Sequence, residues 1–272
     1  FCLSRGLGDV YKRQVYYITD MNIAVDGINT SYVDEGNGKV VVLLHGWGTS
    51  KENLQDLQHF LAKDFRVIVP DLPGFGESAL PPKDWSVGNY VSFIQAFLET
   101  LDVSQVHAIV GHSFGGRVCI KGVGSHTFSP SKIVLIGSAG IQHSTSLRNR
   151  AVVAIAKTGK AILKLPLLRK HYDTARAKLH QQTGSDDYAS AGEMQQVFLN
   201  TIREDLQEMA ANIKTDTLLI WGSEDQDAPL ADARRFNQLI EGSQLKIIQG
   251  AGHFVHNDNP QKVQKWIAEF LS

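Results

Sequence analysis

The stretch Gly111-His112-Ser113-Phe114-Gly115 constrains the fold of this chain more than any other. It follows a strand-like run at residues 107–110, and residues 116–121 after it read as the start of a helix. A serine at such a sharp strand-to-helix turn is a nucleophile elbow, in which the glycines avoid clashes with the neighbouring strand and helix. The turn carries the Ser113 hydroxyl to the open end of a parallel sheet. It also sets the hydroxyl at a helix N-terminus, where positive potential favours developing negative charge.

Two later loops supply the groups that a serine nucleophile needs. Asp225 closes Gly222-Ser223-Glu224-Asp225 after a strand-like run at 217–220, and His253 closes Gly250-Ala251-Gly252-His253 after a run at 245–248. Serine needs a base to take its proton, and that base needs a third group to hold its tautomer. Each of the three residues follows a predicted strand, at the end of the sheet where open α/β sheets bind ligands. We therefore expect Ser113, Asp225 and His253 to form a catalytic triad.

Four motifs in register resemble those of the α/β-hydrolase family, and the resemblance runs from about residue 17 to the C-terminus. Besides the elbow, His45-Gly46-Trp47-Gly48 resembles the oxyanion loop after the third strand, and residues 71–78 resemble the loop after the fourth. Residues 253–260 resemble the histidine loop, with Asp258 where an acid is common. The resemblance implies that the backbone N–H groups of Trp47 and Phe114 form the oxyanion hole.

Strand-like and helical stretches alternate along most of the chain, which predicts a parallel sheet covered on both faces. The resemblance implies that this sheet has the α/β-hydrolase fold. We expect a mostly parallel, eight-stranded sheet with helices on both faces. The expected strands are 17–24, 30–35, 40–44, 65–69, 107–110, 133–136, 217–220 and 245–248, and the expected helices are 52–61, 87–101, one after Ser113, 231–240 and 261–271.

The alternation stops between residues 140 and 212, in a helix-rich stretch where the family carries its lid. We predict a core domain at 15–139 and 213–272 and an inserted helical cap at 140–212. The cap is expected to hold helices at 151–165 and 193–211, the second with Phe198 on its apolar side.

Residues 1–14 show no helix or strand period and begin without methionine. They resemble translated adaptor or vector sequence, so we predict a non-native or disordered segment and leave it out of the fold. The alternative is a natural disordered tail. If the segment is foreign, the true N-terminus is unknown.

The composition narrows the class of protein. A chain of 272 residues with 43% hydrophobic residues fits one large α/β domain, and its net charge of −1 argues against nucleic-acid binding. Cys2 and Cys119 offer no disulfide framework. No apolar run is long enough for an integral membrane segment and no signal peptide is evident, which makes the cytoplasm the expected location. The basic stretch 148–178 is expected to be a solvated cap face; attraction of an anionic substrate or of a membrane surface is the alternative.

Competing residues exist for each role in the predicted site. Ser113 could instead cap the following helix, although the flanking glycines favour the elbow. Glu224 and Asp227 rival Asp225, but the spacing of Asp225 between Gly222 and Pro229 matches the family. His256 is a rival base. The pair His253 and His256 lacks the helical spacing and the glutamate of a zinc protease, so we predict no metal and no cofactor.

The resemblance implies a serine hydrolase that cleaves carboxylic esters through an acyl-enzyme. Phe75, Phe198 and Phe254 are expected to line the substrate pocket, which predicts a small-molecule substrate with an apolar acyl group. Carbon–carbon bond hydrolases of this fold have an oxyanion loop richer in glycine and proline, and cofactor-free peroxidases keep the same triad, so both remain open. A non-catalytic receptor or scaffold usually loses a triad member. The sequence does not predict an oligomeric state.

Overall fold

A computed structural model of the chain describes residues 20–142 and 190–272. The expectations for residues 1–14, for the helix at 151–165 and for the basic stretch 148–178 lie outside the described residues. Within the described ranges, no helix is both long and apolar enough to cross a membrane. The cytoplasmic location stays a prediction.

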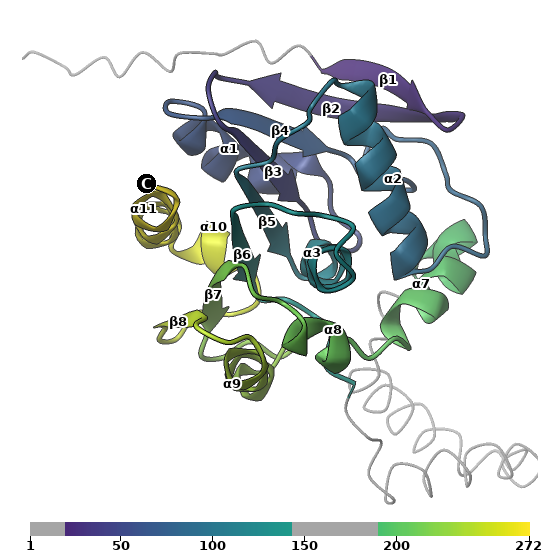
Figure 1. The fold of residues 1–272 in the computed structure, drawn as a ribbon. Helices are drawn as coiled ribbons and strands as arrows, with labels where there is room; N and C mark the ends of the chain where they lie inside the picture. The colour runs from purple at the N-terminus through teal and green to yellow at the C-terminus, as the bar shows by residue number, and fades with distance from the viewer. Residues whose placement is uncertain (1–19, 143–189) are drawn as a thin grey trace, which may run out of the picture.

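The described core is a single sheet of eight strands in the order β1-β2-β4-β3-β5-β6-β7-β8, as Figure 1 shows. Strand β2 pairs antiparallel with β1 and with β4, and every other pair is parallel. The predicted mostly parallel, eight-stranded sheet is therefore confirmed. The strands are β1 (Met21–Val25), β2 (Ile28–Glu35), β3 (Val40–Leu44), β4 (Arg66–Pro70), β5 (Ala108–His112), β6 (Lys132–Ile136), β7 (Asp216–Gly222) and β8 (Gln244–Ile248).

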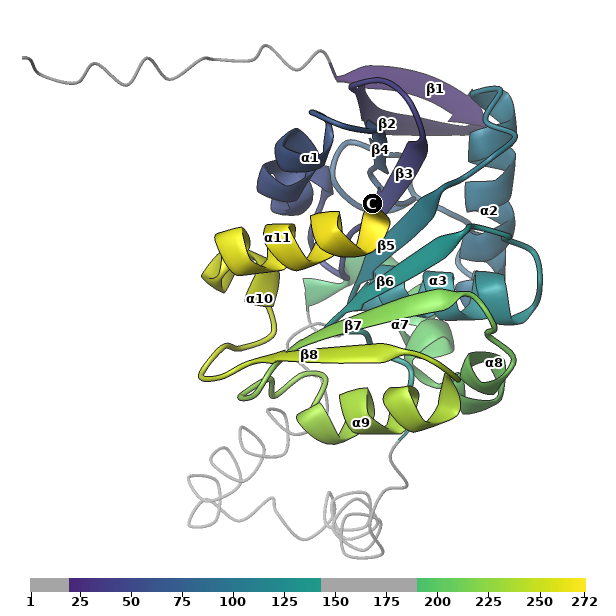
Figure 2. The ribbon, with the colours of Figure 1, turned by 60° about the vertical axis from the view of Figure 1, so that its left-hand side comes forward.

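Helices cover both faces of this sheet, as the two views in Figures 1 and 2 show. One face packs against α2 (Val87–Thr100), α3 (Phe114–Gly124), α8 (Gln207–Ala211) and α9 (Leu230–Leu239), and the other against α1 (Gln55–Leu61) and α11 (Pro260–Leu271). Successive residues of β3 therefore enter opposite cores, with Val42 and Leu44 on one side and Val41 and Leu43 on the other. This double burial explains why the strand reads as a continuous apolar run.

The predicted helix at 193–211 is wrong in one respect, because the structure divides it. A 3-10 turn η3 (Gly192–Met194) leads into α7 (Gln195–Ile202), and α8 follows after a break. In the break, the buried Arg117 guanidinium donates to the carbonyl oxygens of Thr201 and Glu204. The Leu206 N–H donates to the Gly140 oxygen at 2.9 Å. These partners draw the backbone groups out of the helical pattern, so one long helix cannot form.

Two smaller differences concern helix ends. The helix expected at 52–61 begins with a 3-10 turn η1 (Lys51–Leu54) before α1, and the predicted histidine loop contains a short helix α10 (Val255–Asp258). In the described part of the insertion there are helices and no strand. Helix α8 packs against α3 and α9. The domain boundaries at 140 and 212 stay a prediction.

Candidate active site

The turn between β5 and α3 holds Ser113 in a strained backbone conformation. Its φ is 50° and its ψ is −107°, a region that L-residues rarely adopt and that costs on the order of 1–3 kcal/mol. Two hydrogen bonds to β6 and the turn after it hold the conformation. The Ser113 N–H donates to the Ile136 oxygen at 3.0 Å, and its own carbonyl accepts the Ala139 N–H at 3.2 Å. The Ser113 side chain makes no capping bond to α3, so its hydroxyl is not used as a helix cap.

The elbow glycines are required by space, as the sequence predicts. A Cβ at Gly111 would lie 2.6 Å from the backbone of Gly115, and a Cβ at Gly115 would lie 2.1 Å from the Leu44 oxygen. Backbone atoms cannot move aside as a flexible side chain can. Any larger residue would therefore push α3 away from β5 or β3 and displace Ser113.

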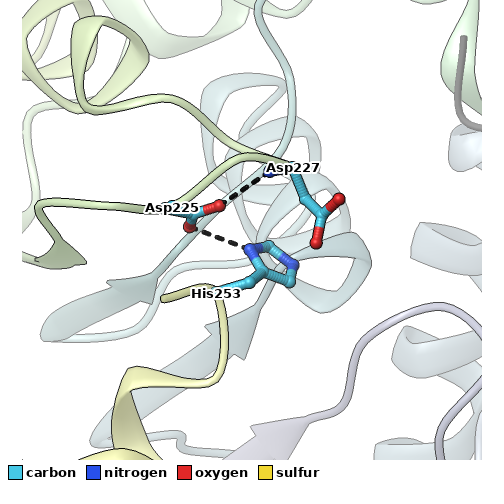
Figure 3. Close-up of side chains that lie close together, drawn as sticks. All are labelled: Asp225, Asp227 and His253. Carbon is cyan, nitrogen blue, oxygen red and sulfur yellow. Dashed lines mark hydrogen bonds and ion pairs between the residues drawn. The ribbon is translucent and has the colours of Figure 1, made fainter. Parts of the chain in front are cut away.

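The loops after β7 and β8 bring Asp225 and His253 together, as Figure 3 shows. The His253 Nδ1 lies 2.8 Å from the Asp225 Oδ2, and the side chain of Asp225 is fully buried while that of His253 is 11% exposed. The Asp225 Oδ1 accepts the N–H groups of Asp227 and Ala228 at 2.9 and 2.8 Å. The Asp225 carboxylate can only accept a hydrogen bond, so the His253 Nδ1 must carry the proton. The His253 Nε2 is then left as an acceptor.

Neither rival acid takes the place of Asp225 in this arrangement. Glu224 is exposed, and Asp227 contributes its backbone N–H while its carboxylate is exposed. The carboxylates of Asp225 and Asp227 and a His253 ring nitrogen have atoms within 4.8 Å of one another, close enough in principle for a metal ion. The His253 Nδ1 and the Asp225 Oδ2 are hydrogen-bonded to each other, so these two atoms have a partner without a metal ion. The absence of a metal stays a prediction.

Gly137, at the end of β6, lies between the elbow and this pair. A Cβ there would lie 3.2 Å from the Asp225 Oδ2 and 3.3 Å from the His253 Nδ1, while the preceding Ile136 accepts the Ser113 N–H. The structure thus gathers the three predicted triad residues at one end of the sheet. In the described residues, no hydrogen bond joins the Ser113 hydroxyl to His253. In enzymes without substrate, this contact commonly tightens only on binding.

The loop after β3 lies directly beside Ser113. A Cβ at Gly46 would be 3.4 Å from the Ser113 Cβ, and the Gly115 N–H donates to the His45 oxygen at 3.0 Å. The N–H groups of Trp47 and Phe114 donate to no group in the described ranges. Amides that donate to no described group, one directly after the nucleophile and one in the loop beside it, are what an oxyanion hole requires.

His45 holds this loop through both ring nitrogens. Its Nε2 accepts the Leu72 N–H at 2.9 Å and its Nδ1 donates to the Gly46 oxygen at 2.8 Å. Burial lowers the pKa of His45, which keeps the ring neutral and the Nε2 able to accept. The residue therefore ties the loop after β3 to the loop after β4.

The three phenylalanines predicted to line the pocket fall into two groups. Phe75 and Phe198 pack on the Trp47 ring, with centroid distances of 4.8 and 5.0 Å, and Phe114 joins them at 5.3 Å. Phe254 instead lies against His112 and His253, at 5.2 and 5.4 Å, and is 38% exposed. The structure brings two of the three together around the predicted oxyanion loop, and the third beside the predicted base.

A cluster of buried imidazoles was not anticipated from the sequence. The His112 Nε2 donates to the His253 carbonyl oxygen at 3.2 Å, and the His112 ring lies 4.5 Å from that of His256. Burial lowers the pKa of His112 well below its usual value, and neighbouring His256 and His253 add to the effect. Burial and His253 likewise lower the pKa of His256 to about 4, and its Nε2 lies 3.0 Å from the Asn53 Oδ1.

These two rings are therefore neutral at neutral pH, and His256 is committed to Asn53 instead of facing a nucleophile. The sequence marked His256 only as a rival base, and it gave no signal that His112 packs against the histidine loop.

Comparison with known proteins identifies the family. The sequence profile of the Alpha/beta hydrolase family matches residues 41–265. A 2-hydroxy-6-oxo-6-(2'-aminophenyl)hexa-2,4-dienoic acid hydrolase of Metapseudomonas resinovorans is 26% identical over 259 residues, covering 90% of this chain and 88% of its own. A monoacylglycerol lipase of Xenopus laevis is 28% identical over 263 residues, covering 89% of this chain and 78% of its own.

Among solved structures, a meta-cleavage product hydrolase from Pseudomonas fluorescens IP01 superposes with a TM-score of 0.69 at 26% identity, covering 93% of this chain and 97% of the other. The matched residues 41–265 include the elbow, the loop after β3 and the loops that carry Asp225 and His253. The chain therefore belongs to the alpha/beta hydrolase family.

Proposed function

We propose that this protein is a serine hydrolase that cleaves carboxylic esters through an acyl-Ser113 enzyme. The observation that carries the proposal is the buried Asp225–His253 hydrogen bond of 2.8 Å, at the end of the sheet where the strained Ser113 turn lies. A strained turn and a buried carboxylate both cost stability, and such costs are typical of functional sites.

The first half of the reaction forms the acyl-enzyme. The His253 Nε2 takes the Ser113 proton as the hydroxyl oxygen attacks the ester carbonyl, and Asp225 stabilises the resulting imidazolium. The N–H groups of Trp47 and Phe114 donate to the oxyanion; losing one such donor costs about 3 kcal/mol. His253 then gives its proton to the leaving alcohol as the bond between carbonyl carbon and alcohol oxygen breaks.

The second half releases the acid. His253 takes a proton from water, the hydroxide attacks the acyl carbon, and the proton returns to Ser113 as its oxygen leaves. The apolar rings around Trp47 favour an apolar acyl group, and Phe198 extends this surface from α7. In this proposal, the insertion at 140–212 acts as a cap that excludes water from the site.

Carbon–carbon bond hydrolysis is the second candidate function. It is favoured by the similarity to the dienoic acid hydrolase of Metapseudomonas resinovorans, at 26% identity over 90% of this chain. Such a reaction would use the same serine and histidine on a ketone instead of an ester. The two functions differ in the bond that is cleaved, so one substrate panel separates them.

The test is hydrolysis of p-nitrophenyl esters with acyl chains of two to twelve carbons, beside a dienoic acid ring-fission product. We expect ester turnover by the wild type and a loss of kcat of several orders of magnitude in Ser113→Ala and in His253→Ala. The double variant should be no worse than either single one, because the two groups act as a unit. Turnover of the dienoic acid alone would favour the second function, and turnover of neither would overturn both.

A further inference from the structure

Asp227 places a second carboxylate beside the predicted catalytic imidazole. Its carboxylate, that of Asp225 and a His253 ring nitrogen have atoms within 4.8 Å of one another. In Figure 3, the Asp227 oxygens lie beside the His253 ring, toward the edge that faces away from Asp225. Asp225 is buried and bonded to the ring, whereas Asp227 is exposed and its carboxylate does not bond to the ring.

The surrounding described groups do not neutralise this carboxylate. His112 and His256, which pack near His253, are held neutral by burial, and Asp225 is already paired with His253. None of the ion pairs formed within 20–142 and 190–272 brings a lysine or arginine to Asp227. In this part of the chain, the negative charge therefore lies beside His253 without a paired lysine or arginine.

The Asp227 carboxylate lies near the place where the leaving alcohol of a substrate would be. In the proposed reaction, the His253 Nε2 protonates the leaving oxygen, which must come within about 3 Å of that nitrogen. A charged group two or three bonds beyond that oxygen would then lie roughly 5–8 Å from the Asp227 carboxylate, where charges near a protein surface still interact although solvent weakens the interaction at an exposed carboxylate. The acyl group is expected on the other side of the attacked carbon, near Trp47.

We propose that Asp227 makes the site favour esters of cationic or neutral alcohols over esters of anionic alcohols. This proposal rests on the proposed ester hydrolysis and specifies which charge on the leaving alcohol the site favours. It also disfavours substrates that carry a carboxylate next to the bond that is cleaved. The Asp227 side chain acts on specificity, while Asp225 alone holds the catalytic imidazole.

The experiment compares three butyrate esters that share the acyl group and differ in the charge of the alcohol. Butyrylcholine is cationic, 3,3-dimethylbutyl butyrate is its neutral isostere, and the butyrate ester of glycolic acid is anionic. We measure kcat/KM for each with the wild type, Asp227→Asn and Glu224→Gln. Glu224 is the matched control, because it is an exposed acid of the same loop that does not belong to the group around His253.

We expect the wild type to prefer the cationic over the anionic ester by about tenfold or more. Asp227→Asn should reduce that preference at least about fivefold, and Glu224→Gln should keep it. Raising the ionic strength from 0.01 to 0.5 M should shrink the preference in the wild type and have little effect in Asp227→Asn, because salt screens an exposed charge. A change caused only by altered packing would not depend on salt.

The outcomes separate this proposal from the proposed function. Hydrolysis of the neutral ester with no charge preference, or an equal preference in Asp227→Asn, would overturn the role of Asp227 and leave ester hydrolysis standing. Failure to hydrolyse any ester would overturn the proposed function. In that case, the affinities of the wild type and of Asp227→Asn for choline and for glycolate would test the role of Asp227 in charge preference. Equal affinities in the two proteins would overturn that role.

Discussion

The two sides of the candidate site are built by different forces. On one side, hydrogen bonds fix polar groups: the Asp225 carboxylate accepts two backbone N–H groups and the His253 ring, and His112 holds the His253 carbonyl. On the other side, the rings of Phe75 and Phe114 pack edge-to-face on Trp47, and the Phe198 ring packs on it at a tilt of 56°. Hydrogen bonds fix single atoms to within tenths of an ångström, whereas ring packing tolerates repacking.

This difference assigns separate roles to the two sides. We call the first the polar side, formed by Asp225, His253, His112 and His256, and the second the aromatic side, formed by Trp47, Phe75, Phe114 and Phe198. Changes on the polar side should affect the rate with every substrate, because each substrate needs the same proton transfers. Changes on the aromatic side should affect some substrates more than others.

The largest effect is expected at Asp225. Asp225→Asn keeps the size of the side chain but favours the wrong His253 tautomer, and should lower kcat by about a thousandfold to ten-thousandfold. Asp227→Asn, which keeps the backbone N–H that donates to Asp225, should lose far less. Steady-state kinetics with one neutral ester checks both variants. A greater loss in Asp227→Asn than in Asp225→Asn would show that Asp227 is the catalytic acid.

The buried histidines of the polar side predict loss of stability in acid. The pKa of His256 is about 4 in the folded protein and near 6.5 when unfolded, so the unfolded chain binds the proton more readily. This contribution is fully present above pH 6.5 and is lost as the pH falls toward about 4, by up to about 3 kcal/mol. Denaturant unfolding at pH 7 and at pH 5 measures it.

His256→Phe serves as the comparison, because phenylalanine fills similar space without a titrating group. The variant should lose less stability between pH 7 and pH 5 than the wild type does. An unchanged pH dependence would mean that His256 is protonated without cost in the folded protein, and would contradict its burial among the other imidazoles.

His112 tests the polar side without touching the reacting atoms. His112→Phe removes the Nε2–H that holds the His253 carbonyl and should lower kcat about tenfold with little change in KM, since the histidine loop is then less well positioned. His112→Gln can still donate a hydrogen bond and should recover part of the loss. A lower melting temperature with unchanged kcat in His112→Phe would assign His112 a structural role alone.

The smallest effect on rate is expected on the aromatic side. Phe198→Ala should shift the preference among acyl chain lengths several-fold while changing turnover of a two-carbon ester less, because a short acyl group barely reaches α7. The panel of p-nitrophenyl esters measures this. Equal losses at all chain lengths would show that Phe198 acts by holding Trp47 or the cap, and would remove the proposed division between the two sides.

The sequence predicted the sheet well for a physical reason. Strands covered on both faces must be apolar throughout, so β3, β5 and β6 were evident as short apolar runs. The elbow was equally evident, because its glycines are required by backbone contacts between neighbouring residues of the motif and β3.

The features that the sequence did not predict depend on contacts between distant residues. The break before α8 depends on Arg117, which lies 84 residues before Thr201 in the chain, and the contact of His112 with His253 spans 141 residues. Nothing local in 193–211 marks that break strongly, and nothing local marks His112 as a partner of the histidine loop. Such contacts follow from the packed fold and not from periodicity.

The acyl-enzyme itself is the most direct test of the account. The protein would be mixed with a slowly hydrolysed ester, quenched in acid within milliseconds to seconds, digested and analysed by mass spectrometry. The account predicts the mass of the acyl group on the peptide that contains Ser113, and no such mass in Ser113→Ala. Ester turnover with the acyl group on another residue, or undiminished turnover by Ser113→Ala, would contradict it.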